Sequence, residues 1–370
     1  MIDTVILEIV ISLSAIIDPK RFKPEIGSWI FNQIEYKKFV NNPTNEDKKK
    51  WGYLPRLTAY LRGRLLVLKL EFSAHKMLVG NNTNEPEGNY SEAVVSRLRE
   101  AVEKMGVLLS NEQIKKASVS GFHASKNIIL SEGYSSAFVI RELRKADISK
   151  KFDIDLKQYR NGGEVLQFYS DHHALVFYDK IRDSEKPAKR AFDKDQTANQ
   201  KSLFQNLDKQ VEILRMEVRL KKGKMKEVFE KICYNNFNPT FEDILNNDLC
   251  QKILKYYWNY FFEDNMFLFD MRNNPQNVLN KILSKNKDKK MPLYKIFGLV
   301  GLIVCSKDEE GTIGVRNTLD FYKPKNNWSK TKKWLDDYKK DLDKFYLHGF
   351  VKDIESQLDE FKPLRIEIKG

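Results

Sequence analysis

The segment 214–220, LRMEVRL, alternates apolar and charged residues with a period of two. In an extended chain its apolar residues point one way, and Arg215, Glu217 and Arg219 point the other way. This alternation is typical of a strand in a sheet that has one buried face and one polar face. The rest of the chain must therefore supply an apolar layer for one face of a sheet.

A second strand pattern, ALVFYDK at 174–180, places Tyr178 and Lys180 on the same face. Tyr178 could be a half-buried residue of an ordinary sheet, with Lys180 extending to water. It could also be a nucleophile. A free tyrosine has a pKa near 10, so an attacking phenolate needs a neighbouring cation, and Lys180 could supply it.

The remaining patterns predict an α+β fold with helices on one face of an antiparallel sheet. A polar excursion is expected at 37–52 and a charged connector at 183–202. The expected strands are an opening strand at the N-terminus, 64–79 running into a Gly-Asn-Asn turn at 80–82, 118–130, a hairpin over 165–180, and 212–223. The expected helices are 90–109 and 135–146, then 224–237, 241–262, 292–305 and 328–345. The pattern changes near residue 225, so we predict a sheet domain over 1–225 and a mostly helical domain over 226–370.

The chain has 370 residues and a formal net charge of +13, which favours a polyanionic partner such as nucleic acid. The opening segment is too short and too charged to span a membrane, and it lacks the basic start of a signal peptide. We therefore expect no membrane association. Cys233, Cys250 and Cys305 have no metal-ligand spacing, and their odd number favours a reducing cytoplasm.

Three polar residues on the expected strands could bind a hard divalent cation. Glu71, His123 and Glu217 could form one cluster on the open face of the sheet and hold Mg²⁺ or Mn²⁺. Taken singly, each is more simply explained as a solvent-facing residue. The chain has no Walker A loop, GxGxxG, GxSxG or HExxH motif.

Two other groups invite a functional interpretation that we consider weaker. His172 and His173 are adjacent on a strand pattern and so would point to opposite faces, which favours a hairpin turn over a metal pair. Tyr256, Tyr257 and Tyr260 suggest a twin-tyrosine helix. Their spacing beside Trp258 is more typical of core packing.

In their order, several motifs resemble the gene II/X replication proteins of filamentous phages and related plasmids. The motifs are MIDTVILEI, LEFSAHKMLVGNN, VSGFHASKNIIL, LVFYDK and LRMEVRLK, within residues 1–225. A fainter similarity continues through KIFGLVGLIVCSKDEEGTIGVRNTL. His123 departs from the family pattern, which usually has aspartate there; histidine can also ligate a metal, but it brings no negative charge.

The resemblance implies the nuclease core of rolling-circle initiators, an RRM-like antiparallel sheet, in the cytoplasm of a bacterial host. It implies metal-dependent nicking and joining of origin DNA, single-stranded and duplex, with Tyr178 as nucleophile and Lys180 beside it. A host helicase and polymerase would then be partners. Two alternatives are a conjugative relaxase and a non-catalytic binder that stacks bases on phenylalanines of the sheet, namely Phe72, Phe122, Phe168 and Phe177.

A basic segment at 322–340 contains seven lysines interleaved with aromatic residues. It could be a solvated amphipathic helix, or it could anchor duplex DNA through its lysines. The candidate DNA contacts are Arg215, Arg219, Lys330, Lys332 and Lys333.

Overall fold

The structure is a computed structural model that describes most of the chain. The described residues are 1–25, 30–31, 34–35, 38–80, 84–184, 211–232, 238–263, 275–285, 291–308, 310–323, 328–339 and 347–365.

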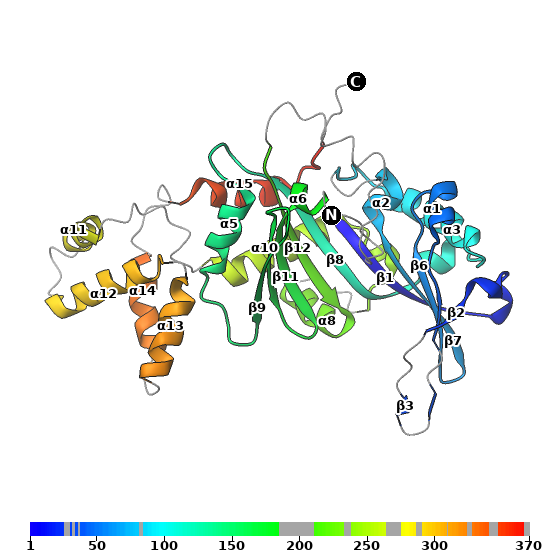
Figure 1. Cartoon of the computed structure of the whole chain (residues 1–370), viewed down its shortest axis with the longest axis horizontal. Coiled ribbons are helices and arrows are strands. Elements are labelled where there is room, and N and C mark those ends of the chain that lie inside the picture. The colour runs from blue at the N-terminus through cyan, green and yellow to red at the C-terminus, as the bar shows by residue number, and fades with distance from the viewer. Residues whose placement is uncertain are drawn as a thin grey trace.

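A ten-stranded antiparallel sheet forms the centre of the molecule (Figure 1). Its strand order is β2-β5-β6-β7-β1-β8-β12-β11-β10-β9. The strands are β1 (Ile2–Ile11), β2 (Lys23–Pro24), β5 (Lys38–Asn41), β6 (Arg56–Arg62), β7 (Leu65–Ser73), β8 (Ser118–Ile129), β9 (Asp153–Gln158), β10 (Glu164–Tyr169), β11 (His173–Asp179) and β12 (Ile213–Lys221). A separate two-stranded sheet pairs β3 (Ile30–Phe31) with β4 (Ile34–Glu35).

The period-two pattern sorts the side chains of the central strands as the sequence predicts. Leu214, Met216 and Val218 of β12 belong to the main hydrophobic core, together with the apolar residues of the neighbouring strands. Aromatic rings join this face of the sheet to the helices, as in the contact of Phe177 with Phe262, whose centroids lie 5.7 Å apart. The opposite face carries the polar residues of the same strands.

Helices account for most of the chain after β12. The helices before it are α1 (Asn45–Trp51), α2 (Ala74–Val79), α3 (Ser91–Lys104), α4 (Asn111–Lys115), α5 (Ser136–Arg144) and α6 (Lys180–Ser184), with short 3₁₀ turns at Leu13–Ala15 and Pro19–Arg21. Those after it are α8 (Lys222–Lys231), α9 (Phe241–Ile244), α10 (Asn247–Phe262), α11 (Pro275–Lys285), α12 (Leu293–Cys305), α13 (Gly311–Tyr322), α14 (Trp328–Lys339) and α15 (Gly349–Glu360). The predicted general α+β layout with a helical C-terminal part is confirmed.

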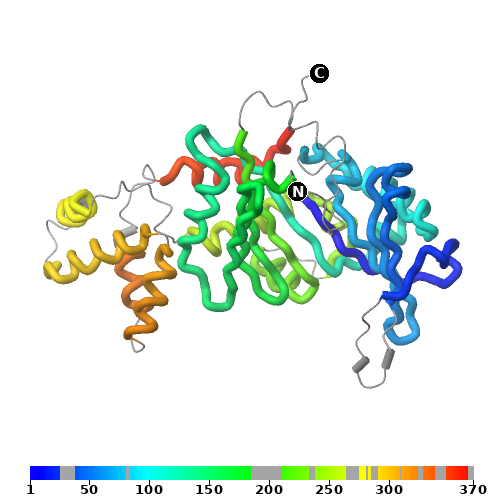
Figure 2. Tube along the Cα trace, viewed as in Figure 1, coloured from blue at the N-terminus to red at the C-terminus, as the bar shows by residue number. Residues whose placement is uncertain are grey.

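The helices after residue 225 fall into two groups. Helices α8, α10 and α15 pack against β8 or β12 of the sheet. The segment α11–α14 lies beyond one edge of the sheet, and α15 then returns to it (Figure 2). The predicted boundary at 225/226 stays a prediction, but one hydrophobic core extends across it.

Two local expectations were wrong. The strand expected over 64–79 ends at Ser73, because the Ser73 hydroxyl accepts a hydrogen bond from Lys76 N and caps α2. The excursion at 37–52 contains β5 and α1, and a capping box between Thr44 and Asp47 starts this helix. Residues 81–82 of the expected turn and 185–202 of the expected connector lie outside the described residues.

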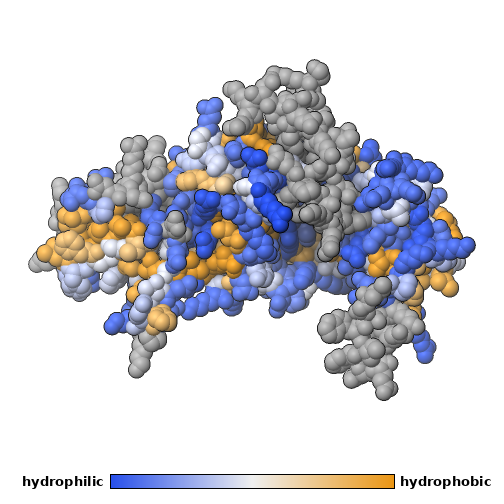
Figure 3. Space-filling model, viewed as in Figure 1, coloured by the Kyte–Doolittle hydropathy of each residue, from blue (hydrophilic) through white to orange (hydrophobic). Residues whose placement is uncertain are grey.

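Exposed apolar side chains gather on α12 and the end of α13 (Figure 3). Leu293, Tyr294, Phe297, Phe321 and Tyr322 are each more exposed than buried. Most apolar residues of this size are covered in a folded chain, so these helices present an open hydrophobic surface.

Candidate active site

Tyr178 lies on the polar face of the sheet, near the end of β11. The alternation of this strand sends Leu175 and Phe177 into the main core and groups Ala174, Val176 and Tyr178 in a small cluster on the opposite face. The Tyr178 side chain is buried, and its hydroxyl donates a hydrogen bond of 3.3 Å to Glu217 Oε2. Burial raises the pKa of Tyr178 well above its usual value, and nearby Arg215 only partly offsets this.

Glu217 is the hub of the polar face. Its Oε1 lies 2.9 Å from Arg219 Nε and 2.9 Å from His123 Nδ1, and its Oε2 lies 3.8 Å from Arg215 Nε. Burial opposes ionisation of Glu217, but Arg219, His123 and Arg215 together hold its pKa well below the usual range. The residue is therefore a carboxylate at neutral pH, and it can orient the Tyr178 hydroxyl.

Arg215 is fully buried beneath this hub. Its Nη2 lies 2.9 Å from Asp3 Oδ2 and donates to Ser125 Oγ at 2.8 Å, while Nη1 donates to Asn127 Oδ1 at 3.1 Å. Burial disfavours its charge, but contact with Tyr178, Asp3 and Glu217 raises the pKa of Arg215 above its usual value. Arg215 is therefore enclosed by the network. The predicted contact with DNA would require the DNA to reach this buried side chain.

Asp3 supplies the second carboxylate of the network. Its Oδ1 accepts a hydrogen bond of 3.0 Å from Ser73 Oγ and lies 3.7 Å from His75 Nδ1. Burial opposes its ionisation, but Arg215 lowers the pKa of Asp3 to about 2. His75 is fully buried, and burial lowers its pKa to about 3, so its imidazole is neutral at physiological pH.

Lys180 lies beside the tyrosine although it no longer belongs to the strand. β11 ends at Asp179, and Lys180 begins α6 with its side chain fully buried. Its Nζ lies 5.7 Å from the centroid of the Tyr178 ring and has no hydrogen-bond partner among the described residues. Burial, with Arg215 nearby, lowers the pKa of Lys180 to about 7. A large fraction of this amine is therefore uncharged at neutral pH.

The three predicted metal ligands do not converge. His123 and Glu217 are in contact, but Glu71 lies elsewhere on the sheet. Across the strands, Glu71 is level with Ile6, then Gly121, then Lys221. Lys221 is four residues beyond Glu217 on β12, so Glu71 is displaced along the strands from Glu217. Three strand spacings of about 4.8 Å also separate β7 from β12. Within the described residues, no group of three or more His, Cys, Asp or Glu side chains is arranged to hold a metal ion. The predicted set does not fit a Mg²⁺ or Mn²⁺ site in this arrangement.

Five residues of the network were not predicted from the sequence: Asp3, Ser73, His75, Ser125 and Asn127. A signal for three of them was available. Ser125 and Asn127 continue the alternation that starts at His123. Asp3 was a charged residue in an apolar strand, a pattern that favours a buried ion pair. Ser73 and His75 lay in the segment wrongly assigned to a continuous strand.

The tyrosines of α10 lie on the other side of the sheet from Tyr178. Tyr257 is buried, and its hydroxyl bonds to His173 Nδ1. Tyr256 and Tyr260 stack on each other beside it, with centroids 6.0 Å apart. Of the adjacent histidines, which were both expected in the hairpin turn, His172 lies in the turn and His173 starts β11 instead.

The other predicted DNA contacts have different surroundings. Arg219 is 40% exposed at its side chain while it binds Glu217. On α14, Lys330 and Lys333 are exposed, and Lys332 Nζ lies 3.4 Å from Asp147 Oδ2. The four phenylalanines considered for base stacking are all fully buried, so they pack in the core instead.

No family model matches the chain, and no curated protein matches it in sequence. Among the described residues, no helix combines the length and apolar character needed to cross a bilayer. A function must therefore be inferred from the site itself.

Proposed function

We propose that the protein cuts and rejoins single-stranded DNA through a covalent bond to Tyr178, as an initiator of rolling-circle replication at a phage or plasmid origin. The observation that carries this proposal is the hydrogen bond from the Tyr178 hydroxyl to Glu217, set among buried cationic side chains. An ordinary sheet tyrosine needs neither an ionised carboxylate at its hydroxyl nor an unpaired buried lysine at its ring. The carboxylate and the lysine both suit a tyrosine whose hydroxyl must be oriented and deprotonated.

In the proposed reaction the Tyr178 oxygen attacks a backbone phosphorus. One bond forms between this oxygen and phosphorus, and the bond from phosphorus to the 3′ oxygen breaks. The phenol proton passes to the uncharged Lys180 amine, and the Lys180 ammonium so formed returns a proton to the leaving 3′ oxygen, which becomes a hydroxyl. The product is a 5′-phosphotyrosyl link, and attack by a 3′ hydroxyl reverses the step without ATP.

Glu217 holds the Tyr178 hydroxyl, whereas Lys180 Nζ lies 5.7 Å from the ring centroid and must approach the hydroxyl, or reach it through one water, to accept the proton. The pKa of Glu217 is held well below its usual range, so its carboxylate takes a proton poorly. The pKa of Lys180 is close to neutral, where a general base works best. Arg215 and Arg219 add positive charge that favours the phosphate as negative charge develops in the transition state.

A covalent trapping experiment tests the proposal. We expect the full-length protein to form an adduct with a single-stranded origin oligonucleotide that survives denaturing electrophoresis. Tyr178→Phe should bind the same oligonucleotide and form no adduct. Tyr257→Phe is the matched control, because it removes a buried hydroxyl from the opposite face of the sheet.

The results separate two classes of function. An adduct in Tyr178→Phe would show that another residue is the nucleophile. Binding without an adduct in the wild-type chain, across origins and added Mg²⁺ or Mn²⁺, would favour a protein that binds DNA and does not cut it.

A further inference from the structure

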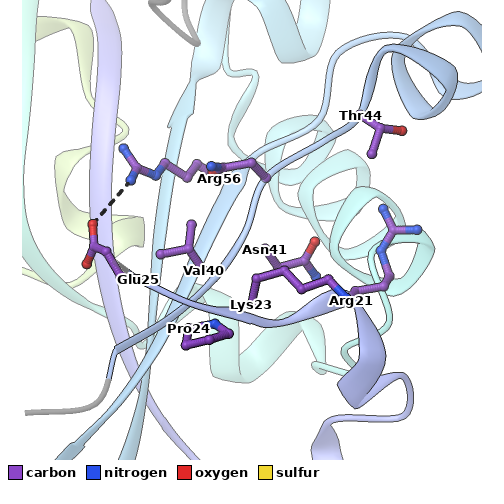
Figure 4. Close-up of a pocket in the computed structure, with 9 residues that line it drawn as sticks. Arg21, Lys23, Pro24, Glu25, Val40, Asn41, Thr44 and Arg56 are labelled. Carbon is purple, nitrogen blue, oxygen red and sulfur yellow. Dashed lines mark ion pairs between the residues drawn. The ribbon is translucent and has the colours of Figure 1, made fainter. Parts of the chain in front are cut away.

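A pocket of about 510 Å³ lies at the β2 end of the sheet, well away from Tyr178 in strand order. Arg21, Lys23 and Arg56 line it, and Figure 4 shows Arg21 and Arg56 toward opposite ends, with Lys23 between them. The other lining residues are Pro24, Glu25, Val40, Asn41, Asn42 and Thr44. The pocket is therefore lined by three basic residues and one acidic residue.

Both arginines that line the pocket have hydrogen-bonding capacity that is not used. The Nε atoms of Arg21 and Arg56 are buried and have no hydrogen-bond partner among the described residues. A buried polar group without a partner costs free energy, on the order of 1–3 kcal/mol. The Nε atoms themselves are not exposed to the pocket, but they show that neither guanidinium group is fully paired, and the excess of positive charge in the lining favours a ligand with acceptor atoms.

The remaining contacts hold Arg21 in place. Its Nη2 lies 2.7 Å from Asp47 Oδ2, and its guanidinium lies 6.0 Å from the Trp51 ring centroid. Asp47 thus fixes one side of the guanidinium and leaves the Nε edge unpaired. Arg56 is less constrained, because its acidic partner Glu25 is 3.9 Å away and largely solvated.

We propose that this pocket binds a phosphate group. Phosphate oxygens match the planar donors of arginine, and Lys23 adds a mobile positive charge. A neighbouring pocket of about 350 Å³ shares Glu25 and Arg56 and continues over Thr58, Lys69 and Glu71. Glu71 and its neighbours lie on the polar face that also carries Tyr178, so a nucleic-acid backbone crossing this face could place a phosphate in the pocket. A small phosphate compound could fill it equally well, and the proposal does not depend on cleavage at Tyr178.

The test uses the full-length protein and two probes: inorganic phosphate, and a fluorescent single-stranded oligonucleotide. We expect phosphate to raise the melting temperature relative to chloride at the same ionic strength, and Arg56→Gln and Lys23→Gln to lose most of this increase. Arg99→Gln is the matched control, since Arg99 is an arginine of α3 with a side chain 37% exposed, against 36% for Arg56.

The oligonucleotide identifies the source of the phosphate. If the pocket holds a nucleic-acid backbone, Arg56→Gln will weaken oligonucleotide binding several-fold and reduce the salt slope by about 0.7 for each phosphate that the variant no longer neutralises. If oligonucleotide binding is unchanged while the phosphate effect disappears, the pocket takes a small phosphate compound. Absence of a phosphate effect in the wild-type chain, or equal loss in Arg56→Gln and Arg99→Gln, would overturn the proposal. Tyr178→Phe should retain the phosphate effect, which separates this site from the cleavage reaction.

Discussion

The side-chain amide of Gln357 pairs with both backbone groups of Ile129. Gln357 Nε2 donates to Ile129 O at 2.8 Å, and Ile129 N donates to Gln357 Oε1 at 3.0 Å. Helix α15 thus continues the hydrogen bonding of β8 at its end. Next to this contact, the backbone of Ser131 donates to Asp353 at 2.8 Å. These bonds make α15 part of the sheet domain.

This relationship predicts that residues 1–225 will not fold alone. The fragment lacks α10 and α15, so Phe168 and Phe177 lose their partners in α10. We expect a fragment without a cooperative thermal transition. A chain in which a flexible linker replaces 275–339 should keep the transition, because it retains both helices. Circular dichroism melts of the two proteins test this, and a sharp transition in the 1–225 fragment would contradict it.

The hub position of Glu217 predicts a large effect of Glu217→Gln. This change leaves Arg215, Arg219 and His123 without their shared carboxylate. We expect a loss of about 3–5 kcal/mol in the free energy of unfolding, as for other broken buried ion pairs, together with loss of the covalent adduct.

Glu71→Gln is the matched control for this prediction, since Glu71 lies on the same face outside the network. It should change stability by less than about 0.5 kcal/mol, measured by urea unfolding. A strong and selective loss of metal-dependent cleavage in Glu71→Gln would instead support the metal role predicted from the sequence.

Lys180 predicts a pH dependence of both stability and cleavage. Its pKa is about 7 in the folded chain and near 10.5 when unfolded, so the unfolded state binds more protons between these values. The stability contributed by this group therefore rises through that window, by about 1.4 kcal/mol per pH unit. Lys180→Met should remove this rise in the free energy of unfolding. It should stabilise the chain most, relative to wild type, below pH 7, where the wild-type chain buries a charged amine.

The rate of adduct formation should increase with pH around 7 in the wild-type chain, as the Lys180 amine loses its proton. Single-turnover rates between pH 5.5 and 9 measure this. A flat profile would show that Lys180 does not accept the proton.

We predict that the exposed lysines of α14 contribute part of the affinity for duplex DNA. Replacing Lys330 and Lys333 by glutamine should weaken duplex binding and lower the salt slope by about 0.9 for each phosphate that is no longer neutralised. Lys104→Gln, an exposed lysine at the end of α3, is the control. Equal duplex affinity of the double variant and the control would place the duplex-binding surface elsewhere.

The sequence predicts the strands of this fold better than the contacts between them. Period-two alternation correctly indicates β11 and β12 and the faces that carry Tyr178 and Glu217. Strand order is not encoded in that period, because any register that buries the same face satisfies it. This is why Glu71 and Glu217 could be expected in one cluster although their strands are separated by β1 and β8.

Residues of the site that lie at strand ends were the hardest to predict. Ser73 and Lys180 each lie where a strand gives way to a helix, and the side chain after such a change no longer follows the alternation. Lys180 reaches the tyrosine through the start of α6 and not through the strand pattern used to predict it. Asp3 was missed because its partner Arg215 comes from the far end of the sheet domain in sequence.

The place of β1 within the sheet determines when the site can form during synthesis. β1 is made before the other described strands, but its neighbours in the sheet are β7 and β8, and Arg215 arrives only with β12. Until β12 leaves the ribosome, Asp3 has no Arg215 partner, and the apolar residues of β8 on the side facing β12 have no neighbouring strand. Contacts between residues far apart in the sequence form slowly, and the apolar segments that they will bury stay exposed until then. A ribosome stalled before residue 213 should therefore carry a chain that chaperones bind, and this binding should persist until α10 and α15 have also left the ribosome.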